Sequence, residues 1–318
     1  MKRTVLCGLL LILFATAVHA TTVRINCNMP GPLGKISTAL KLLNTHATNT
    51  IKISGVCREN LLITQFDNLS LIAEPGAEIV DNSGEVQPVI NITDSREVTI
   101  QGFKITGGST GVMCFDASLC RFSGNTIERS AAAGVWVNHS QATFAGDIIQ
   151  DTGDPGLGIQ ASKVAAGGLT VQRSSGVGIY DSNGSVLEAW AITIQGNRAD
   201  GVLVISQSHL FMGESTVINN AYNGIDVNDQ SEVLLLQNIV ITNGYNGVAV
   251  GDLSLANLGG GGTFTGNSTD IICGDKYSVA KLIQGATYGT TNCPLPQVQT
   301  PAVKQQVPQR LIIRPPAE

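Results

Sequence analysis

The sequence has little charge and few aromatic side chains. Asp, Glu, Lys and Arg make up 14% of its 318 residues and aromatic residues make up 5%, with only two tryptophans and five tyrosines. Acidic residues outnumber basic ones by 24 to 19, and no segment gathers Lys and Arg into a stripe. The composition therefore argues against nucleic acid as a partner and against a polybasic membrane-binding patch.

Long apolar runs are absent after residue 20, so the sequence predicts no membrane-spanning helix. The first twenty residues, MKRTVLCGLLLILFATAVHA, have a basic start, a short apolar run and small residues at the cleavage positions, Val18 and Ala20. This pattern predicts a secretory signal peptide over residues 1–20. We therefore expect a protein that is secreted or periplasmic.

The sequence also lacks C-x-x-C pairs and His/Cys clusters, which argues against a structural metal site. Six cysteines remain outside the leader, and an even number in an exported chain indicates three disulfides. Because these cysteines fall as three local pairs along the chain, the pairing we favour is Cys27–Cys57, Cys114–Cys120 and Cys273–Cys293.

What the sequence does contain is a repeat, clearest from Gly178 to Gly251. Several columns of identical residues recur with a step of 23: Gly178, Gly201, Gly224 and Gly247; Ser185, Ser208, Ser231 and Ser254; Asn197, Asn220 and Asn243. A fixed period of this length is typical of a solenoid, in which each unit buries its apolar face by stacking on its neighbours. Stacked amides of the Asn column are expected to stabilise the turns.

Each unit contains three short runs of alternating residues. In the unit 201–223 the runs are Val202–Ile205, His209–Met212 and Ser215–Ile218, which indicates three strands per turn. We expect a three-faced parallel β-helix of roughly ten rungs, right-handed by the general preference for parallel crossovers. Two inward columns are predicted: Val112, Val135, Ile159, Ile179, Val202, Ile225 and Val248; and Ile105, Ile127, Ile149, Val171, Ile194, Val217 and Val240.

The two ends of the chain differ from the repeat. Residues 21–62 read as strand, helix and strand, and Leu33, Ile36, Leu40 and Leu43 give the helix an apolar stripe. Because a solenoid must cover its open end, we interpret this helix as an N-terminal cap. The β-helix itself is predicted over 63–293. Residues 294–318 hold six of the 11 prolines and are predicted to form a disordered tail.

Several of these features together resemble a known family. The segment I-x-I-x-G-x-C-x-E-N (51–60) and the Gly-Val/Ile openings followed by Asn-rich turns are similar to bacterial right-handed parallel β-helix repeat proteins of the pectate-lyase-like superfamily. The resemblance covers about residues 22–293 and implies the fold. It implies no single activity, because the superfamily includes lyases, hydrolases, epimerases and adhesins, and the N-T-D and D-P-H-D motifs of two enzyme groups are missing here.

The outward columns carry the candidate binding residues. Taking Gly158 as a rung opening gives the outward column Met113, Trp136, Gln160, Tyr180, Leu203, Asp226 and Ala249. Exposed aromatic rings beside polar groups suit stacking on sugar rings. We therefore predict a substrate-binding face for a polysaccharide or cell-surface glycan, formed by Trp136, Asn138, His139, Lys163 and Tyr180. The alternative is that a loop or a second subunit covers the two rings.

The candidate catalytic residues are His139, Lys163, Asp226 and Asp229. The first two are possible acid/base partners without a flanking carboxylate pair. Two groups of carboxylates have the composition of a glycosidase-like acid pair or a Ca²⁺ site: Asp226, Asp229 and Asp252, and Asp147, Asp151 and Asp154. Aspartate is also an ordinary turn former at such positions, so neither a cofactor nor a bound metal is predicted, and Ca²⁺ stays open.

One carboxylate stands out because its register points inward. Asp181 follows Ile179 by two residues, and a buried carboxylate needs a partner. The short step from Gly158 to Gly178 suggests instead that the rung is locally irregular at this position.

Two functions remain open from the sequence. The first is an exported β-helix protein that binds a polysaccharide along an outward face and, if it is an enzyme, modifies it as a lyase, hydrolase or epimerase. The second is a non-catalytic structural or adhesin-like surface protein, in which the rod itself is the function.

Overall fold

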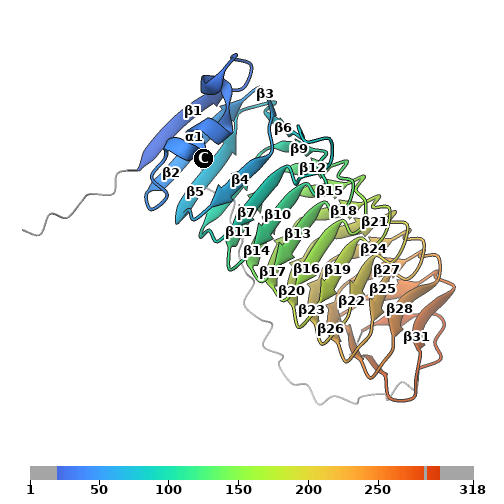
Figure 1. Ribbon diagram of the computed structural model, residues 1–318. Coiled ribbons are helices and arrows are strands. Elements are labelled where there is room, and N and C mark those ends of the chain that lie inside the picture. Colours follow the sequence, from blue (N-terminus) through green and yellow to red (C-terminus); the bar gives the residue numbers. More distant parts are fainter. Residues whose placement is uncertain (1–19, 283–284, 294–318) are drawn as a thin grey trace, which may run out of the picture.

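The computed structural model describes residues 20–282 and 285–293, and it is a solenoid of three long parallel sheets (Figure 1). Sheet A contains β1 (Thr21–Asn26), β2 (Thr48–Ser54), β5 (Asn68–Ala73), β8 (Val98–Gln101), β11 (Leu119–Ser123), β14 (Gln141–Ala145), β17 (Lys163–Gly167), β20 (Val186–Trp190), β23 (His209–Gly213), β26 (Glu232–Leu236), β29 (Leu255–Gly259) and β32 (Val279–Leu282).

The other two sheets complete each turn. Sheet B contains β3 (Val56–Arg58), β6 (Glu78–Val80), β9 (Lys104–Thr106), β12 (Thr126–Glu128), β15 (Ile148–Gln150), β18 (Thr170–Gln172), β21 (Thr193–Gln195), β24 (Thr216–Ile218), β27 (Ile239–Ile241), β30 (Thr263–Thr265) and β33 (Thr287–Tyr288). Sheet C contains β4 (Leu61–Thr64), β7 (Ile90–Thr93), β10 (Val112–Phe115), β13 (Val135–Asn138), β16 (Leu157–Gln160), β19 (Ile179–Ser182), β22 (Val202–Val204), β25 (Ile225–Val227), β28 (Asn246–Val250) and β31 (Thr269–Cys273). The prediction of an all-β, three-faced parallel solenoid is confirmed.

The core is a set of aliphatic columns along the inside of the three sheets. The predicted column of sheet B is confirmed in full, since its members pair rung by rung from Ile105 to Val240 and all are buried. Each rung buries its apolar side chains only against the rungs above and below it, and this burial is the main force that holds the solenoid together.

The predicted column of sheet C is wrong at one rung. Leu157, and not Ile159, pairs with Val135 and Ile179. The reason lies in the segment Gly156-Leu157-Gly158, which offers two possible opening glycines. A side chain at Gly156 would overlap the carbonyl oxygen of Gly178, the opening glycine of the next rung. The opening glycines Gly134 and Gly178 each approach the opening glycine one rung on in the same way. Gly156 is therefore the opening glycine of its rung.

The N-terminal end carries one short α-helix. A 3₁₀ turn, η1 (Pro32–Gly34), precedes α1 (Ile36–Leu42), and α1 buries Ile36 and Leu40 as predicted. Leu33 was wrongly placed on the buried stripe, because it lies in the 3₁₀ turn with 75% of its surface exposed. The Glu59 carboxylate accepts hydrogen bonds from the backbone N–H groups at the start of α1, those of Ile36 (2.8 Å) and Ser37 (3.1 Å). The capping role of α1 stays a prediction.

All three favoured disulfides are present. Cys27–Cys57 and Cys273–Cys293 join their Cα atoms across 5.0 Å, and Cys114–Cys120 across 6.5 Å. The first links the N-terminal strands to sheet B, the second lies in the core, and the third ties the last described residues to β31. Three disulfides fit an oxidising compartment.

Two ladders of polar side chains stabilise the turns. The Asn197 amide donates to Asn220 (2.8 Å), Asn220 donates to Asn243 (3.0 Å), and Asn243 donates to Asn267 (3.1 Å). The serine column bonds differently: each hydroxyl accepts from the backbone N–H one rung back, as Ser208 does from Ser185 at 3.2 Å. The structural interpretation of both columns is confirmed.

Two predicted segments lie outside the described residues. They are the signal peptide, apart from Ala20, and the Pro-rich segment 294–318. Among the described residues, no helix has the length and apolar character needed to cross a membrane.

Candidate functional site

The most conspicuous outward feature of sheet C is a pair of aromatic rings. Trp136 on β13 and Tyr180 on β19 both align with Gly158 on β16, which lies between them. Their ring centroids are 6.3 Å apart and their planes differ by 26°, so the rings stack over the glycine. Any side chain on Gly158 would overlap the indole of Trp136. The predicted column placed Gln160 at this position; the structure corrects it to Gly158.

Polar groups continue this surface toward the turn into sheet A. Asn138 aligns with Gln160 and donates a hydrogen bond to its side-chain oxygen at 3.0 Å. The imidazole of His139, which is exposed in the turn, contacts the Asn138 amide oxygen. Trp136, Asn138 and His139 therefore follow one another along a single strand end, as predicted.

Lys163 lies elsewhere than predicted. It aligns with Gln141 and Val186 at the start of β17 in sheet A, and not with the turn position of His139. Its ammonium group forms an ion pair with Glu188 at 3.1 Å. A groove of about 510 Å³ still includes both His139 and Lys163, so the two side chains share one depression at the turn between sheets C and A.

Asp226 on β25 lies in the same outward column as Tyr180. Its hydrogen-bond partners are asparagines, and the second carboxylate beside it is Asp200 and not Asp229. Asn223 donates from its side chain to Asp226 (3.3 Å) and from its backbone to Asp200 (2.8 Å). Asn228 donates to the other oxygen of Asp226 at 2.8 Å, and Asn246 donates to Asn223 at 2.7 Å. Two carboxylates and three amides thus form one connected network across successive rungs.

This network shifts the protonation of its carboxyls. Partial burial, with the neighbouring Asp200 charge as a second cause, raises the pKa of Asp226 to about 6. Burial also raises the pKa of Asp200. Asp229 is exposed in a left-handed turn, with φ of 55°, which is the position of an ordinary turn aspartate.

The other aspartate group is dispersed. Asp147 is buried and accepts from the Asn125 side chain at 2.8 Å, Asp151 pairs with Arg173, and Asp154 accepts from a backbone N–H at 2.9 Å. Among the described residues, no three His, Cys, Asp or Glu side chains come together as a metal site.

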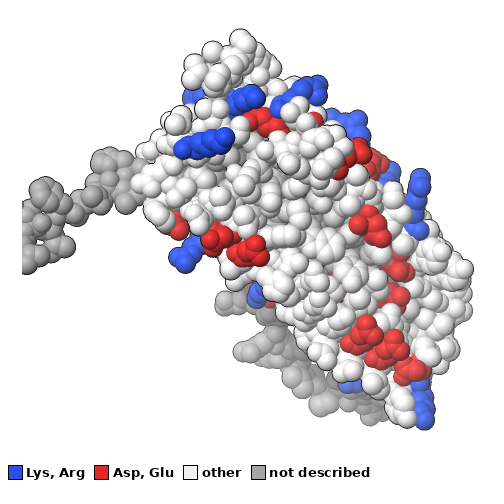
Figure 2. All heavy atoms as spheres, viewed as in Figure 1, with Lys and Arg blue, Asp and Glu red and all other residues white. Residues whose placement is uncertain are grey.

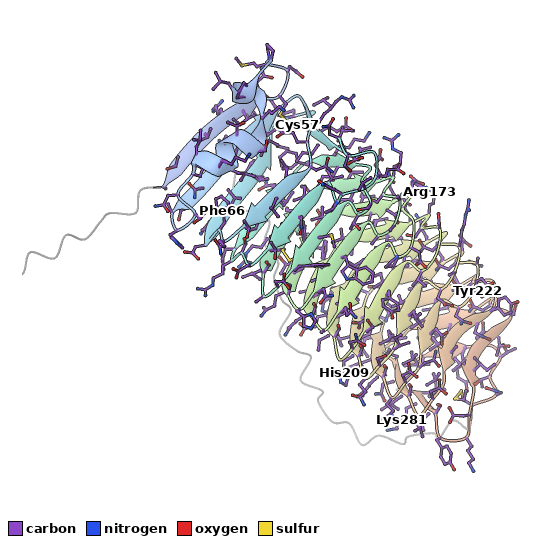
Figure 3. The ribbon with its side chains drawn as sticks, viewed as in Figure 1. Cys57, Phe66, Arg173, His209, Tyr222 and Lys281 are labelled. Carbon is purple, nitrogen blue, oxygen red and sulfur yellow. A yellow bond between two sulfur atoms is a disulfide. The ribbon has the colours of Figure 1, made fainter. Side chains whose placement is uncertain are left out.

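A second aromatic pair escaped the sequence interpretation. Tyr222 and Tyr245 lie in successive turns between sheets B and C, stacked with centroids 5.4 Å apart and planes 8° apart. They are 52% and 59% exposed. Figure 3 shows Tyr222 along the same long edge of the solenoid as Arg173, with His209 along another edge. Tyr222 and Tyr245 are 23 residues apart, which is the repeat period, and this spacing was the signal in the sequence that could have identified the pair.

The outward face of sheet C carries little charge. On its described strands β4 to β28 the outward side chains include no Lys or Arg, and Asp226 is the one carboxylate among them. Figure 2, viewed onto this sheet, shows a largely white centre, with red and blue atoms mostly toward its edges.

Asp181 lies directly behind this surface, on the inner side of β19. It aligns with Ile159 and Val204 in a regular strand, so the expected local irregularity is wrong. The side chain is fully buried, and neither carboxyl oxygen has a hydrogen-bond partner. Burial raises the pKa of Asp181 to about 8, so the group is protonated at neutral pH.

Comparison with known proteins shows to which family this solenoid belongs. The family model for the right-handed β-helix region matches residues 49–188 and 167–284. The chain belongs to the right-handed β-helix family. No curated protein matches this β-helix in sequence.

Solved structures agree on the fold of this β-helix. The A-module of the mannuronan C-5 epimerase AlgE4 from Azotobacter vinelandii superposes with a TM-score of 0.57 at 13% identity, over 78% of this chain and 88% of that one. Pectate lyase Pel9A gives 0.52 at 10% identity, over 87% and 80%. An alginate lyase from Paenibacillus sp. str. FPU-7 gives 0.52 at 13% identity, over 85% and 97%. The recognition of a pectate-lyase-like right-handed β-helix is confirmed.

Proposed function

We propose that this protein is exported and binds a polysaccharide along the outward face of sheet C. The observation that carries the proposal is the stacked pair Trp136 and Tyr180 over Gly158. In a sequence with two tryptophans and five tyrosines, placing two rings in one outward column over a glycine creates a flat apolar surface. Such surfaces bind the apolar faces of sugar rings.

The surroundings of the rings suit sugar hydroxyls. The linked amides of Asn138 and Gln160 lie at one end of the same strands, and the network around Asp226 lies three rungs beyond Gly158. Rungs are about 4.8 Å apart, so the surface from Trp136 to Asp226 extends about 19 Å. This length and the regular spacing suit an extended polymer of several sugar units.

The solved relatives support the same class of ligand. The epimerase, the pectate lyase and the alginate lyase described above are, by their names, enzymes that act on polysaccharides. At 10–13% identity these likenesses show the fold alone, so the ligand class is inferred from the aromatic and amide groups of this chain first. The three disulfides fit export to an oxidising compartment.

If the protein also modifies its ligand, Asp226 is the residue best suited to transfer a proton. Its pKa of about 6 lies close to neutrality, where a carboxyl can both give and accept a proton. The alternative function, a non-catalytic structural or adhesin-like rod, requires no turnover.

Replacing Trp136 with alanine is expected to weaken polysaccharide binding by about tenfold, because a stacked aromatic ring contributes on the order of 1.4 kcal/mol. Affinity electrophoresis or calorimetry against a panel of soluble polysaccharides measures this. Trp190 provides the matched control, since it lies over Gly213 in the same way but on sheet A. Equal loss in W136A and W190A, or no loss in W136A, would contradict the proposal.

A further inference from the structure

The tyrosine pair and the carboxylate network together form a second feature of the binding surface. Tyr222 is the chain neighbour of Asn223, whose side chain and backbone hold Asp226 and Asp200. Tyr245 is the neighbour of Asn246, which donates to Asn223. The stacked rings therefore adjoin the asparagines of the network that holds Asp200, in the preceding turn, and Asp226, on β25, at the sheet B edge of sheet C.

The rings are not explained by the fold. Both are more than half exposed, whereas the asparagines and serines of these rungs complete buried ladders. An exposed stacked aromatic pair offers a flat apolar surface of the same kind as Trp136 and Tyr180.

The charged side chains around the tyrosine pair determine which charge a bound polymer can carry. Asp200 and Asp226 face this surface, and the one cation in the three neighbouring turns (196–200, 219–223 and 242–246) is the exposed Arg198. The outward strand residues of sheet C, as described above, include no Lys or Arg. A polymer with a carboxylate on each sugar would bring repeated negative charge against two carboxylates with little to offset it.

We propose that Tyr222 and Tyr245, with Asp200 and Asp226, form a second sugar-binding subsite, and that the polysaccharide bound by this protein carries no carboxylate on its sugars. Tyrosine rings stack on the sugar faces, and the carboxylates accept hydrogen bonds from sugar hydroxyls. The inference rests on the proposed function and specifies its substrate class, since the solved relatives named for pectate and alginate act on polymers that carry carboxylates.

The test of the substrate class compares charged polymers with their uncharged esters and with neutral polymers. Binding of the full chain at pH 8 is compared between polygalacturonate and its methyl ester, between alginate and its propylene glycol ester, and across uncharged glucans and mannans. At least one uncharged polymer is expected to bind, at least tenfold more tightly than any of the charged polymers. The inference is overturned if a charged polymer binds more tightly than its own ester does. It is also overturned if a charged polymer binds more tightly than every uncharged polymer.

The test of the subsite uses the double variant Y222A/Y245A, with Tyr277→Ala as the matched control because Tyr277 is also exposed (61%) but lies outside these turns. The double variant is expected to lose at least fivefold in affinity, and Y277A to stay unchanged. Near-ultraviolet circular dichroism and the denaturation midpoint verify that the variant is folded. If W136A lowers affinity while Y222A/Y245A does not, the subsite fails and the proposed function stands; if no polysaccharide binds, both fail.

Discussion

Replacing Asp181 with valine is expected to stabilise the protein, and to do so more strongly as the pH rises. Asp181 is fully buried between Ile159 and Val204, and its carboxyl has no hydrogen-bond partner. Even when protonated, an unpartnered carboxyl costs about 1–3 kcal/mol. Valine fits an inward position that aliphatic residues occupy on both neighbouring rungs.

The pH dependence follows from the raised pKa. In the folded protein Asp181 holds its proton up to a pH of about 8, whereas in the unfolded chain it loses the proton near its ordinary value of 3.8. The unfolded state therefore binds fewer protons between these values, and stability falls as the pH rises from about 4 to about 8 before it levels off. Between pH 5 and pH 9 the gain in stability of D181V over the parent should grow by about 4 kcal/mol, because each unit of pKa difference corresponds to about 1.4 kcal/mol.

Urea denaturation midpoints of the parent and of D181V at pH 5, 7 and 9 measure this effect. D229N is the matched control, because it removes an aspartate charge at an exposed turn of left-handed backbone that asparagine tolerates. A difference between the parent and D181V that does not grow with pH would contradict the assignment of a buried, protonated carboxyl.

Replacing Asn220 with alanine is expected to destabilise the protein by about 3–5 kcal/mol. Asn220 lies in the middle of the buried amide ladder, where it accepts from the Asn197 side chain at 2.8 Å and donates to Asn243 at 3.0 Å. Its removal leaves the backbone and side-chain N–H donors of Asn197 without their acceptor, whereas Asn243 still accepts from the backbone N–H of residue 220 at 3.1 Å. Each buried unsatisfied group costs about 1–3 kcal/mol. The small cavity adds to the loss.

Guanidinium denaturation followed by circular dichroism measures the change. Asn219→Gly serves as the control, because Asn219 is the exposed neighbour, and its φ of 56° suits glycine. Because each rung contacts only its neighbours, N220A is also expected to broaden the transition. Equal midpoints for N220A and N219G would show that the ladder contributes little.

The periodic part of the fold could be predicted because it is repeated. The sheet B column and the asparagine and serine ladders follow from a step of 22 or 23 residues, and the inward positions of Val202 and Val204 follow from the alternation along a strand. Local pairing of the cysteines sufficed for the disulfides. The prediction failed where the period offered two registers, at Gly156 and Gly158, since only the close approach to the Gly178 carbonyl decides between them.

The site was harder to predict than the fold. Trp136 and Tyr180 were found because they lie on strands, where alternation tells outward from inward. Tyr222 and Tyr245 were missed because they lie in turns, where no alternation applies. The partner of Asp226 was assigned to Asp229 in the same rung, whereas Asp200 approaches from the turn of the previous rung.

Emission from Trp136 during titration with polysaccharide tests the central claim most directly. The chain has two tryptophans, so the variant Trp190→Phe leaves Trp136 as the only one, and Trp136→Phe leaves Trp190. The titration uses each polymer that the parent binds. Our account predicts a saturable blue shift of the emission in W190F and no change in W136F, because only Trp136 lies on the proposed binding face. A saturable shift in W136F with none in W190F would place the ligand on sheet A and contradict the account.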